Sequence, residues 1–371
     1  PMHRISQSTI EPARRAHASQ ASDIKKFRDP RHPSAFGSGL IALDLIANVD
    51  SPSSFQAHAG GTCGNVLTIL AYLGWNSFPI ARLSDDAASQ VVRADLSRWG
   101  VHLDHASCKP SSHTPIIVQR IRRKRDGTPK HSFSWACPSC GKRLPGFQPV
   151  TRAVVEAIAP DLQHAKVFFM DRLSRGILDL AAIAAEKGAL VMYEPSGVAE
   201  ARLVKEAITL AHVVKYAETR LAQLENLWNC SAATMIEIQT LGEHGLRYRH
   251  KLGAKRSSWL TLPAIDAPRL VDTCGSGDWC SAGYLAETFR LKPAGLRNLK
   301  PTELKQALRY GQALAAWNCG FEGARGGMYA STKNVFEMQI AKLLAGDLPA
   351  LPASIQAPVE AEYPTCPRCL A

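Results

Sequence analysis

The stretch Leu270–Gly283, LVDTCGSGDWCSAG, decides both the fold and the candidate chemistry of this chain. It places a Gly-x-Gly turn where a loop becomes a helix, because an apolar helical pattern follows over Tyr284–Phe289. The first turn of a helix leaves N–H groups without intrahelical partners, and the helix dipole adds about half a positive charge there. Gly275 and Gly277 allow a ligand to approach this backbone closely, so the turn is suited to binding phosphate.

Asp278 distinguishes this turn from a plain phosphate-binding loop. A carboxylate repels phosphate, whereas a kinase uses one to take the proton from an attacking hydroxyl. On this hypothesis, the backbone N–H groups of Gly275, Ser276 and Gly277 hold the charge on the transferred phosphoryl group. The alternative is a structural aspartate that caps the helix.

Two motifs carry a resemblance to a known family. Asp272–Asp278, DTCGSGD, resembles the C-terminal signature of the ribokinase-like (PfkB) sugar and nucleoside kinases. Gly60–Asn65, GGTCGN, resembles the N-terminal Gly-Gly-x-x-x-Asn signature of the same family, and an apolar helix follows it. The resemblance covers about residues 36–329. It implies transfer of a phosphoryl group from ATP, accompanied by magnesium, to a hydroxyl of a sugar or nucleoside.

The resemblance also implies roles for individual residues. Glu218 is the candidate acid near magnesium, because Ala217–Arg220 stands where the family has Asn-x-x-Glu, and both expected residues are absent. The acceptor-binding candidates lie at the end of an apolar strand expected over Phe36–Ile46 and in the N-terminal signature: Asp44, Gly60, Gly61 and Asn65. Three nucleotide-binding candidates lie in a loop that resembles the family's Thr-x-Gly-x-x-Gly: Thr240, Gly242 and Gly245. The other two candidates are Thr273 and Asn318.

Alternating apolar strands and helices predict an α/β fold. We expect a ribokinase-like three-layer sandwich, with a central, mainly parallel sheet, helices on both faces and a small β lid. The expected divisions are an N-terminal arm over 1–33, a kinase domain over 34–335 and a tail over 336–371. The lid and its insertion occupy about 112–148. In the family the lid is often a dimer contact, which implies a homodimer. The lid cations Arg120, Arg122 and Lys124 either meet an anionic acceptor or form a solvated face.

Two Cys-Pro-x-Cys pairs, Cys137–Cys140 and Cys366–Cys369, are not required by the family. The first is followed by Gly141, as in a zinc knuckle. Four sulfurs complete the closed tetrahedral set of a structural zinc site, with the metal ligands Cys137, Cys140, Cys366 and Cys369. Such a site would clamp the tail Asp347–Ala371 onto the lid, or onto the lid of a partner chain. The alternative, a redox or disulfide pair, is disfavoured in a reducing compartment.

Composition narrows the class of protein. The 371 residues are 46% hydrophobic and carry a net charge of +12, with pI ≈ 9.3, which favours anionic partners such as nucleotides or phosphorylated metabolites. No apolar run approaches the ~20 residues of a membrane span, so no membrane association and a cytoplasmic location are expected. A Gly-x-x-x-x-Gly-Lys-Ser/Thr loop is absent, which excludes a P-loop enzyme.

Two other functions stay open at this point. The missing Asn-x-x-Glu pair favours a degenerate kinase that serves as a nucleotide- or sugar-binding interaction module. The basic lid segment Arg120–Lys130 favours a nucleic-acid-associated protein, but no aromatic residues interleave with its charges, so this hypothesis is the weakest. The core motifs do not identify the acceptor, because kinases of pentoses, hexoses, phosphosugars and nucleosides share them.

Overall fold

Strands from residues 34–262 form one central sheet. The computed structural model describes residues 31–47, 55–108, 111–123, 129–137, 140–196, 199–218, 233–252 and 256–352. Nine strands of this described part form the sheet, in the spatial order β13 (Leu260–Leu262), β12 (Leu246–His250), β11 (Ile236–Thr240), β10 (Val213–Ala217), β9 (Leu190–Tyr193), β8 (Ala165–Met170), β1 (Ser34–Ser38), β4 (Asn76–Leu83) and β5 (Ala106–Cys108). From β5 to β11 neighbouring strands run parallel, and β12 and β13 are antiparallel.

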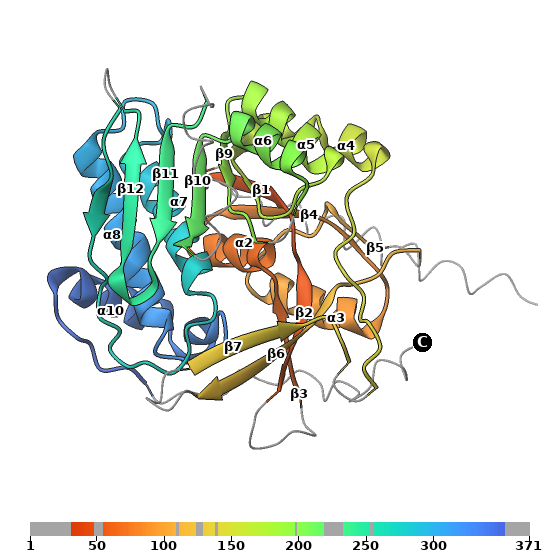
Figure 1. Cartoon of the computed structure of the whole chain (residues 1–371), viewed down its shortest axis with the longest axis horizontal. Helices are drawn as coiled ribbons and strands as arrows, with labels where there is room; N and C mark the ends of the chain where they lie inside the picture. The colour runs from red at the N-terminus through yellow and green to blue at the C-terminus, as the bar shows by residue number, and fades with distance from the viewer. Residues whose placement is uncertain are drawn as a thin grey trace, which may run out of the picture.

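Helices cover both faces of this sheet, as expected (Figure 1). The strands are buried on both faces and accordingly read as continuous apolar runs, for example AKVFFM in β8. One apolar core lies under α4, α5 and α6, and a larger one lies under α2, α7, α8 and α10. The helices are α2 (Thr62–Tyr72), α3 (Ala87–Arg98), α4 (Arg152–Ile158), α5 (Arg175–Glu186), α6 (Ala201–Leu210), α7 (Ser276–Leu291), α8 (Pro301–Asn318), α9 (Gly326–Ala330) and α10 (Lys333–Ala345).

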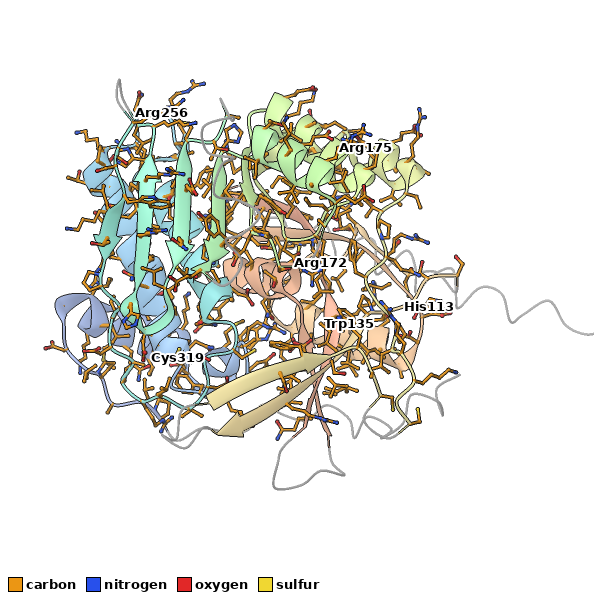
Figure 2. All side chains as sticks on the ribbon, in the orientation of Figure 1. His113, Trp135, Arg172, Arg175, Arg256 and Cys319 are labelled. Carbon is orange, nitrogen blue, oxygen red and sulfur yellow. The ribbon has the colours of Figure 1, made fainter. Side chains whose placement is uncertain are left out.

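A second, four-stranded sheet forms the lid (Figure 1). Its face that carries Leu43, Leu45 and Val118 is buried in the larger core and packs against α3. Trp135, labelled in Figure 2, packs on the other face near Ile117. The strands stand in the order β3 (Phe55–Gly60), β2 (Ala42–Ala47), β6 (Ile116–Arg123) and β7 (Pro129–Ser134).

The single strand expected over Phe36–Ile46 is wrong: the structure divides it between the two sheets. β1 ends at Ser38, and the chain then crosses to the lid, where β2 begins at Ala42. The crossing is fixed by Asp171, whose Oδ1 accepts a hydrogen bond of 2.8 Å from the Leu40 N–H. A Cβ at Gly39 would lie 1.8 Å from the same oxygen, so only glycine allows this approach.

Helix α10 crosses the expected division between residues 335 and 336. Phe336 is buried and packs edge-on against the Trp317 ring of α8, with ring centroids 4.8 Å apart. The first residues of the expected tail therefore pack into the larger apolar core. None of the described helices is both long enough and apolar enough to cross a membrane.

Candidate active site

The two signatures meet in space through Asn65 and Asp278. The Asn65 side chain Nδ2 donates to Asp278 Oδ2 at 2.7 Å, although 213 positions separate the two residues. Asn65 lies in the first turns of α2, and Asp278 lies in the first turn of α7. Both side chains are buried. The structure therefore brings together the two residues for which the sequence predicted acceptor-binding and catalytic roles.

The turn before α7 is fixed by contacts with the loop that follows α8. Asp272 accepts hydrogen bonds from the N–H groups of Cys274 (2.8 Å) and Gly323 (2.9 Å). Gly275 has φ of 73°, and a Cβ there would lie 2.3 Å from Ala324 O, so the turn requires glycine on two counts. The first N–H groups of the 16-residue helix α7 therefore stand in a fixed position, suited to an anion.

The environment of Asp278 favours the protonated carboxyl group. Burial and the nearby Glu194 charge raise the pKa of Asp278 well above its ordinary value, against the opposing effects of the Asn65 hydrogen bond and the Lys215 charge. A general base works best when its pKa lies near the working pH. This shift moves Asp278 from the range of an ordinary carboxyl group in that direction.

A buried ion pair below the turn was missed by the sequence reasoning. Lys215, in β10, donates to Glu194 at 2.5 Å and to the Gly277 carbonyl at 3.1 Å. Ser281 of α7 donates to the second Glu194 oxygen at 2.5 Å. Burial opposes the charge of Lys215, but the Glu194 carboxylate raises its pKa above the ordinary value. The available signal was a lysine and a glutamate at the carboxyl ends of neighbouring apolar strands, where open α/β sheets bind ligands.

Asp44 lies on the lid strand β2, and its carboxyl group lies against the N-terminal signature. A Cβ on Gly60 would lie 1.9 Å from Asp44 Oδ2, so the glycine makes room for the acid. Burial raises the pKa of Asp44 to about 7, although the Arg325 charge and a hydrogen bond from the Gly61 backbone lower it. Asp44 Oδ1 and Asn65 Oδ1 are buried and accept no hydrogen bond within the described chain. Both atoms are suited to accept hydrogen bonds from ligand hydroxyls.

The Cys274 thiol lies near both Asp44 and Asp278. Burial, and then the charges of Asp272, Asp44 and Asp278, raise the pKa of the Cys274 thiol. Both Asp44 and Asp278 therefore lie close enough to influence the same side chain. The thiol also contacts Gln119 of lid strand β6, with 3.5 Å between Sγ and Oε1. The lid thus lies directly over the turn that begins α7.

Arg325 ties the N-terminal signature to the C-terminal half of the chain. Its Nη2 donates to the Ala59 carbonyl at 2.5 Å and to Asp95 at 2.6 Å. The Tyr329 hydroxyl donates to the second Asp95 oxygen at 2.5 Å. Arg325 is almost fully buried, so these contacts hold the end of β3 rigidly beside Asp44.

The nucleotide-binding candidates divide into an open group and a buried one. The loop of Gly242–His244 that follows Thr240 is exposed, and so is Thr273. Glu218 is exposed directly after β10. Asn318 is fully buried, and its amide donates to Ala324 O at 3.1 Å and accepts from Gly327 N at 3.2 Å. Asn318 therefore holds the loop after α8 and presents no surface to a ligand.

The segment of the first cysteine pair is held beside the lid by two backbone hydrogen bonds. The Cys137 N–H donates to Lys142 O at 2.8 Å, and the Gly141 N–H donates to Cys137 O at 2.9 Å. Cys137 is buried and Cys140 is exposed. The second pair, Cys366 and Cys369, lies outside the described residues. Among the residues that are described, no group of three or more His, Cys, Asp or Glu side chains could hold a metal ion.

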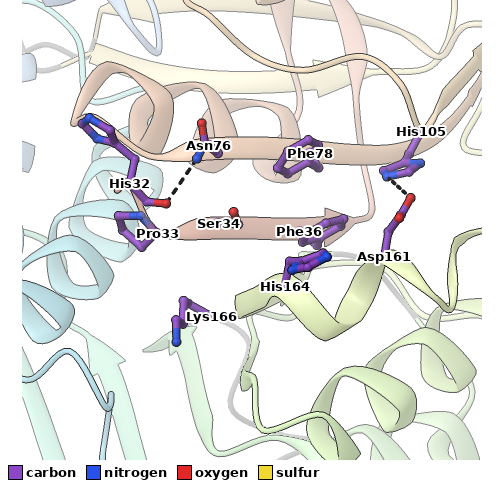
Figure 3. A pocket seen from close by; sticks show the side chains of 10 residues that line it. All are labelled: His32, Pro33, Ser34, Phe36, Asn76, Phe78, His105, Asp161, His164 and Lys166. Carbon is purple, nitrogen blue, oxygen red and sulfur yellow. Dashed lines mark hydrogen bonds and ion pairs between the residues drawn. The ribbon is translucent and has the colours of Figure 1, made fainter. Parts of the chain in front are cut away.

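A separate cavity of about 330 Å³ lies at the amino ends of β1 and β4 (Figure 3). It is lined by Ser34 and Asn76, the first residues of β1 and β4, and by the stacked rings of Phe36 and Phe78. The candidate site instead uses residues at the carboxyl ends of β8, β9 and β10, such as Glu194. The cavity is therefore distinct from the site built around Asp278.

Comparison with known proteins agrees with this geometry. The family model for the pfkB family carbohydrate kinases matches residues 35–330. A search of curated protein sequences found no match.

Solved structures of low sequence identity share the fold. An Arabidopsis thaliana ribokinase complexed with ribose and ATP is 18% identical, with a TM-score of 0.62 over 84% of this chain and 99% of that one. A Xylella fastidiosa fructokinase with bound ATP is 20% identical, with a TM-score of 0.62 over 78% and 93% of the two chains. A Burkholderia thailandensis nucleoside kinase in complex with inosine is 18% identical, with a TM-score of 0.62 over 86% and 99%. The family match spans most of the chain, and the two signatures meet at one site: the chain belongs to the pfkB family of carbohydrate kinases.

Proposed function

We propose that this protein transfers the γ-phosphoryl group of MgATP to a hydroxyl of a sugar or nucleoside, with Asp278 as the general base. The contact between Asn65 and Asp278, 2.7 Å long, carries the proposal. The buried carboxyl group of Asp278 lies beside Asn65, the proposed acceptor-binding residue, and at the start of α7, where an anion is stabilised. A purely structural cap would not need a partner from the other signature.

The proposed reaction uses few protein groups. Asp44 and Asn65 accept hydrogen bonds from hydroxyls of the acceptor and hold it beside Asp278. Asp278 takes the proton of the attacking hydroxyl as its oxygen bonds to the γ-phosphorus, and the bond between that phosphorus and the β,γ-bridging oxygen breaks to release ADP. The N–H groups of Gly275 and Gly277 bind the charge of the transferring group. The Ser276 N–H already lies 3.3 Å from Thr273 O, so it contributes less.

The site fits the phosphates of the nucleotide on two observations. Gly275 adopts the left-handed conformation that exposes the start of α7. Gly277, two positions later, has no side chain that could cover this helix end. The buried Lys215 adds a positive charge beside Gly277. Magnesium enters as part of the MgATP substrate, because phosphate oxygens are ligands that it prefers. The half-buried Thr240 and the exposed Gly242 and Thr273 are the candidates for holding the rest of the nucleotide, and Gly245 shapes the loop that follows Thr240.

ADP release measured by a coupled assay tests the function. The purified chain is incubated with ATP, magnesium and a panel of pentoses, hexoses and ribonucleosides. We expect acceptor-dependent release of ADP with at least one compound and a phosphorylated product in mass spectrometry. Nucleotide binding without turnover for any acceptor would instead support the degenerate kinase, which the missing Asn-x-x-Glu pair and the exposure of Glu218 favour.

Structural zinc is a separate part of this proposal. Cys137 and Cys140 lie three positions apart in a segment held by the hydrogen bond from the Gly141 N–H to the Cys137 carbonyl, and Cys366 and Cys369 have the same spacing. We expect about one zinc ion per chain by elemental analysis, because four thiolates complete a tetrahedral site. The double substitution of Cys366→Ser and Cys369→Ser should remove the metal. The double substitution of Cys63→Ser and Cys319→Ser, outside both pairs, should leave it in place. A full-length protein without zinc would contradict the site.

A further inference from the structure

The cavity at the amino ends of β1 and β4 lies away from the candidate active site. Open α/β sheets bind their substrates at the carboxyl ends of the strands, where Glu194 follows β9 in this chain. None of the described residues assigned to phosphoryl transfer lines the cavity. Its volume of about 330 Å³ is within the range of pockets that hold small molecules. The cavity is therefore a candidate site for a second ligand.

An interruption of the strand pairing places Lys166 at this cavity. β1 pairs Ser34 with Ala165 of β8, but its next residue pairs with Val167. Lys166 is therefore an extra residue with no opposite partner in β1. Such a β-bulge redirects a side chain, and bulges are frequent next to active sites. The Lys166 side chain lines the cavity and is exposed, and no described carboxylate lies within ion-pairing distance of its ammonium group.

Two further hydrogen-bond donors line the cavity with Lys166 (Figure 3). His164 ends the short 3₁₀ helix η1 (Asp161–His164) and is exposed. Its imidazole carries at least one ring N–H in either protonation state. Ser34, the first residue of β1, adds a hydroxyl group. An ammonium group, an imidazole and a hydroxyl group together suit an anionic ligand.

The charges of the lining favour an anion with one negative charge. Asp161 also lines the cavity, where its Oδ2 lies 3.3 Å from Nε2 of His105. This carboxylate repels a dianion more strongly than a monoanion. A phosphate monoester carries about −1.5 to −2 charges at neutral pH, whereas a carboxylate carries one. The single positive charge of Lys166 therefore matches a carboxylate better than a phosphate group.

The remaining lining provides an apolar wall. Phe36 and Phe78 are stacked on each other, with ring centroids 4.7 Å apart, and both belong to the smaller apolar core. Pro33 also lines the cavity. Because the two rings are held by their mutual contact and by the core, they form a fixed surface for an apolar group. A ligand that matches both parts of the cavity carries a carboxylate on a compact apolar body.

We infer that this cavity binds a small organic carboxylate, with its carboxylate group at Lys166 and His164 and its apolar body against Phe36. This ligand is neither the phosphoryl acceptor nor the nucleotide, because the cavity lies at the other ends of the strands. The inference therefore goes beyond the proposed function and does not depend on it.

Three probes that share one apolar body and differ in the polar group test the inference: benzoate, benzamide and phenyl phosphate. Their binding to the full chain is measured by ligand-observed NMR titration, with saturating MgATP present to occupy the nucleotide site. We expect benzoate to bind about tenfold to a hundredfold more tightly than benzamide, because the amide lacks the charge that Lys166 binds. Phenyl phosphate should bind more weakly than benzoate.

Lys166→Met keeps a long side chain and removes its charge. It should weaken benzoate binding about tenfold to a hundredfold and leave benzamide binding unchanged, because the amide relies on the apolar wall. Lys187→Met, which removes an exposed lysine at the end of α5, is the matched control and should change neither affinity. Thermal unfolding of both variants checks that the fold is retained.

Three results would overturn the inference. Benzoate that shows no saturable binding would exclude the site. Equal affinities for benzoate and benzamide, or equal effects of the two lysine substitutions, would show that Lys166 does not bind the carboxylate. Tighter binding of phenyl phosphate than of benzoate would assign the cavity to phosphorylated ligands instead. Each of these results leaves the proposed phosphoryl transfer unaffected, because ADP release is measured separately.

Discussion

Replacing Asp278 with asparagine is expected to lower kcat by about a thousandfold or more while the fold is retained. General-base catalysis typically contributes about 10²–10⁴-fold to a rate, and asparagine cannot take a proton from the acceptor. The substitution keeps the size of the side chain, and its amide oxygen can still accept the hydrogen bond from Asn65. The measurement is ADP release at saturating ATP and acceptor, with thermal unfolding as the check on the fold.

The matched control for this variant is Asp266→Asn, which removes an exposed carboxylate from the loop before the signature. It should leave kcat unchanged. The pH dependence of kcat/KM is an independent test of this role. Because burial and Glu194 raise the pKa of Asp278, the wild-type enzyme should lose kcat/KM as pH falls at a higher pH than an ordinary aspartate would give. A variant with undiminished kcat would remove Asp278 from the role of base.

The parts of this protein that the sequence predicted are those that backbone geometry requires. Gly275 stands at a positive φ and against the carbonyl of Ala324, so glycine is needed there in any chain that builds this turn. Gly60 leaves room for the carboxyl group of Asp44 in a similar way. Glycines that are required in this way appear in the sequence as short motifs with fixed spacing, such as the two signatures. The apolar strands gave the central sheet for the same reason, because parallel strands buried on both faces must be apolar throughout.

The parts that the sequence did not predict depend on contacts between distant segments. The strand expected over Phe36–Ile46 is apolar throughout, and nothing in its periodicity shows that Asp171 holds the chain at Leu40 as it crosses to the lid. Lys215 and Glu194 read as the polar ends of two separate strands. Their pairing under Gly277 follows only from the order of strands in the sheet. The side of the lid that each residue occupies likewise required the register between β6 and β7.

Replacing Asp44 with asparagine should weaken acceptor binding and stabilise the protein at the same time. Hydrogen bonds to a charged group are worth roughly 1.5–3 kcal/mol, so the acceptor KM should rise about tenfold to a hundredfold, with an unchanged ATP KM. Asp85→Asn, in an exposed turn, is the control and should alter neither constant. An acceptor KM that stays at the wild-type value would exclude Asp44 from the acceptor site.

The stability change has a sign that follows from the raised pKa of Asp44. The carboxyl group has a pKa of about 7 in the folded chain against an ordinary 3.8, chiefly because it is buried. At a pH between these two values, Asp44 loses its proton in the unfolded chain and keeps it in the folded chain. The contribution of Asp44 to the free energy of unfolding of the wild type therefore falls as pH rises, and it is lowest above about pH 7. Asparagine carries no charge at any pH, and each unit of the shift corresponds to about 1.4 kcal/mol. Asp44→Asn should therefore raise Tm by several degrees at pH 8 and progressively less toward pH 4. A lower Tm for the variant at pH 8 would show that the charge of Asp44 stabilises the fold, and that the Arg325 guanidinium outweighs the cost of burial.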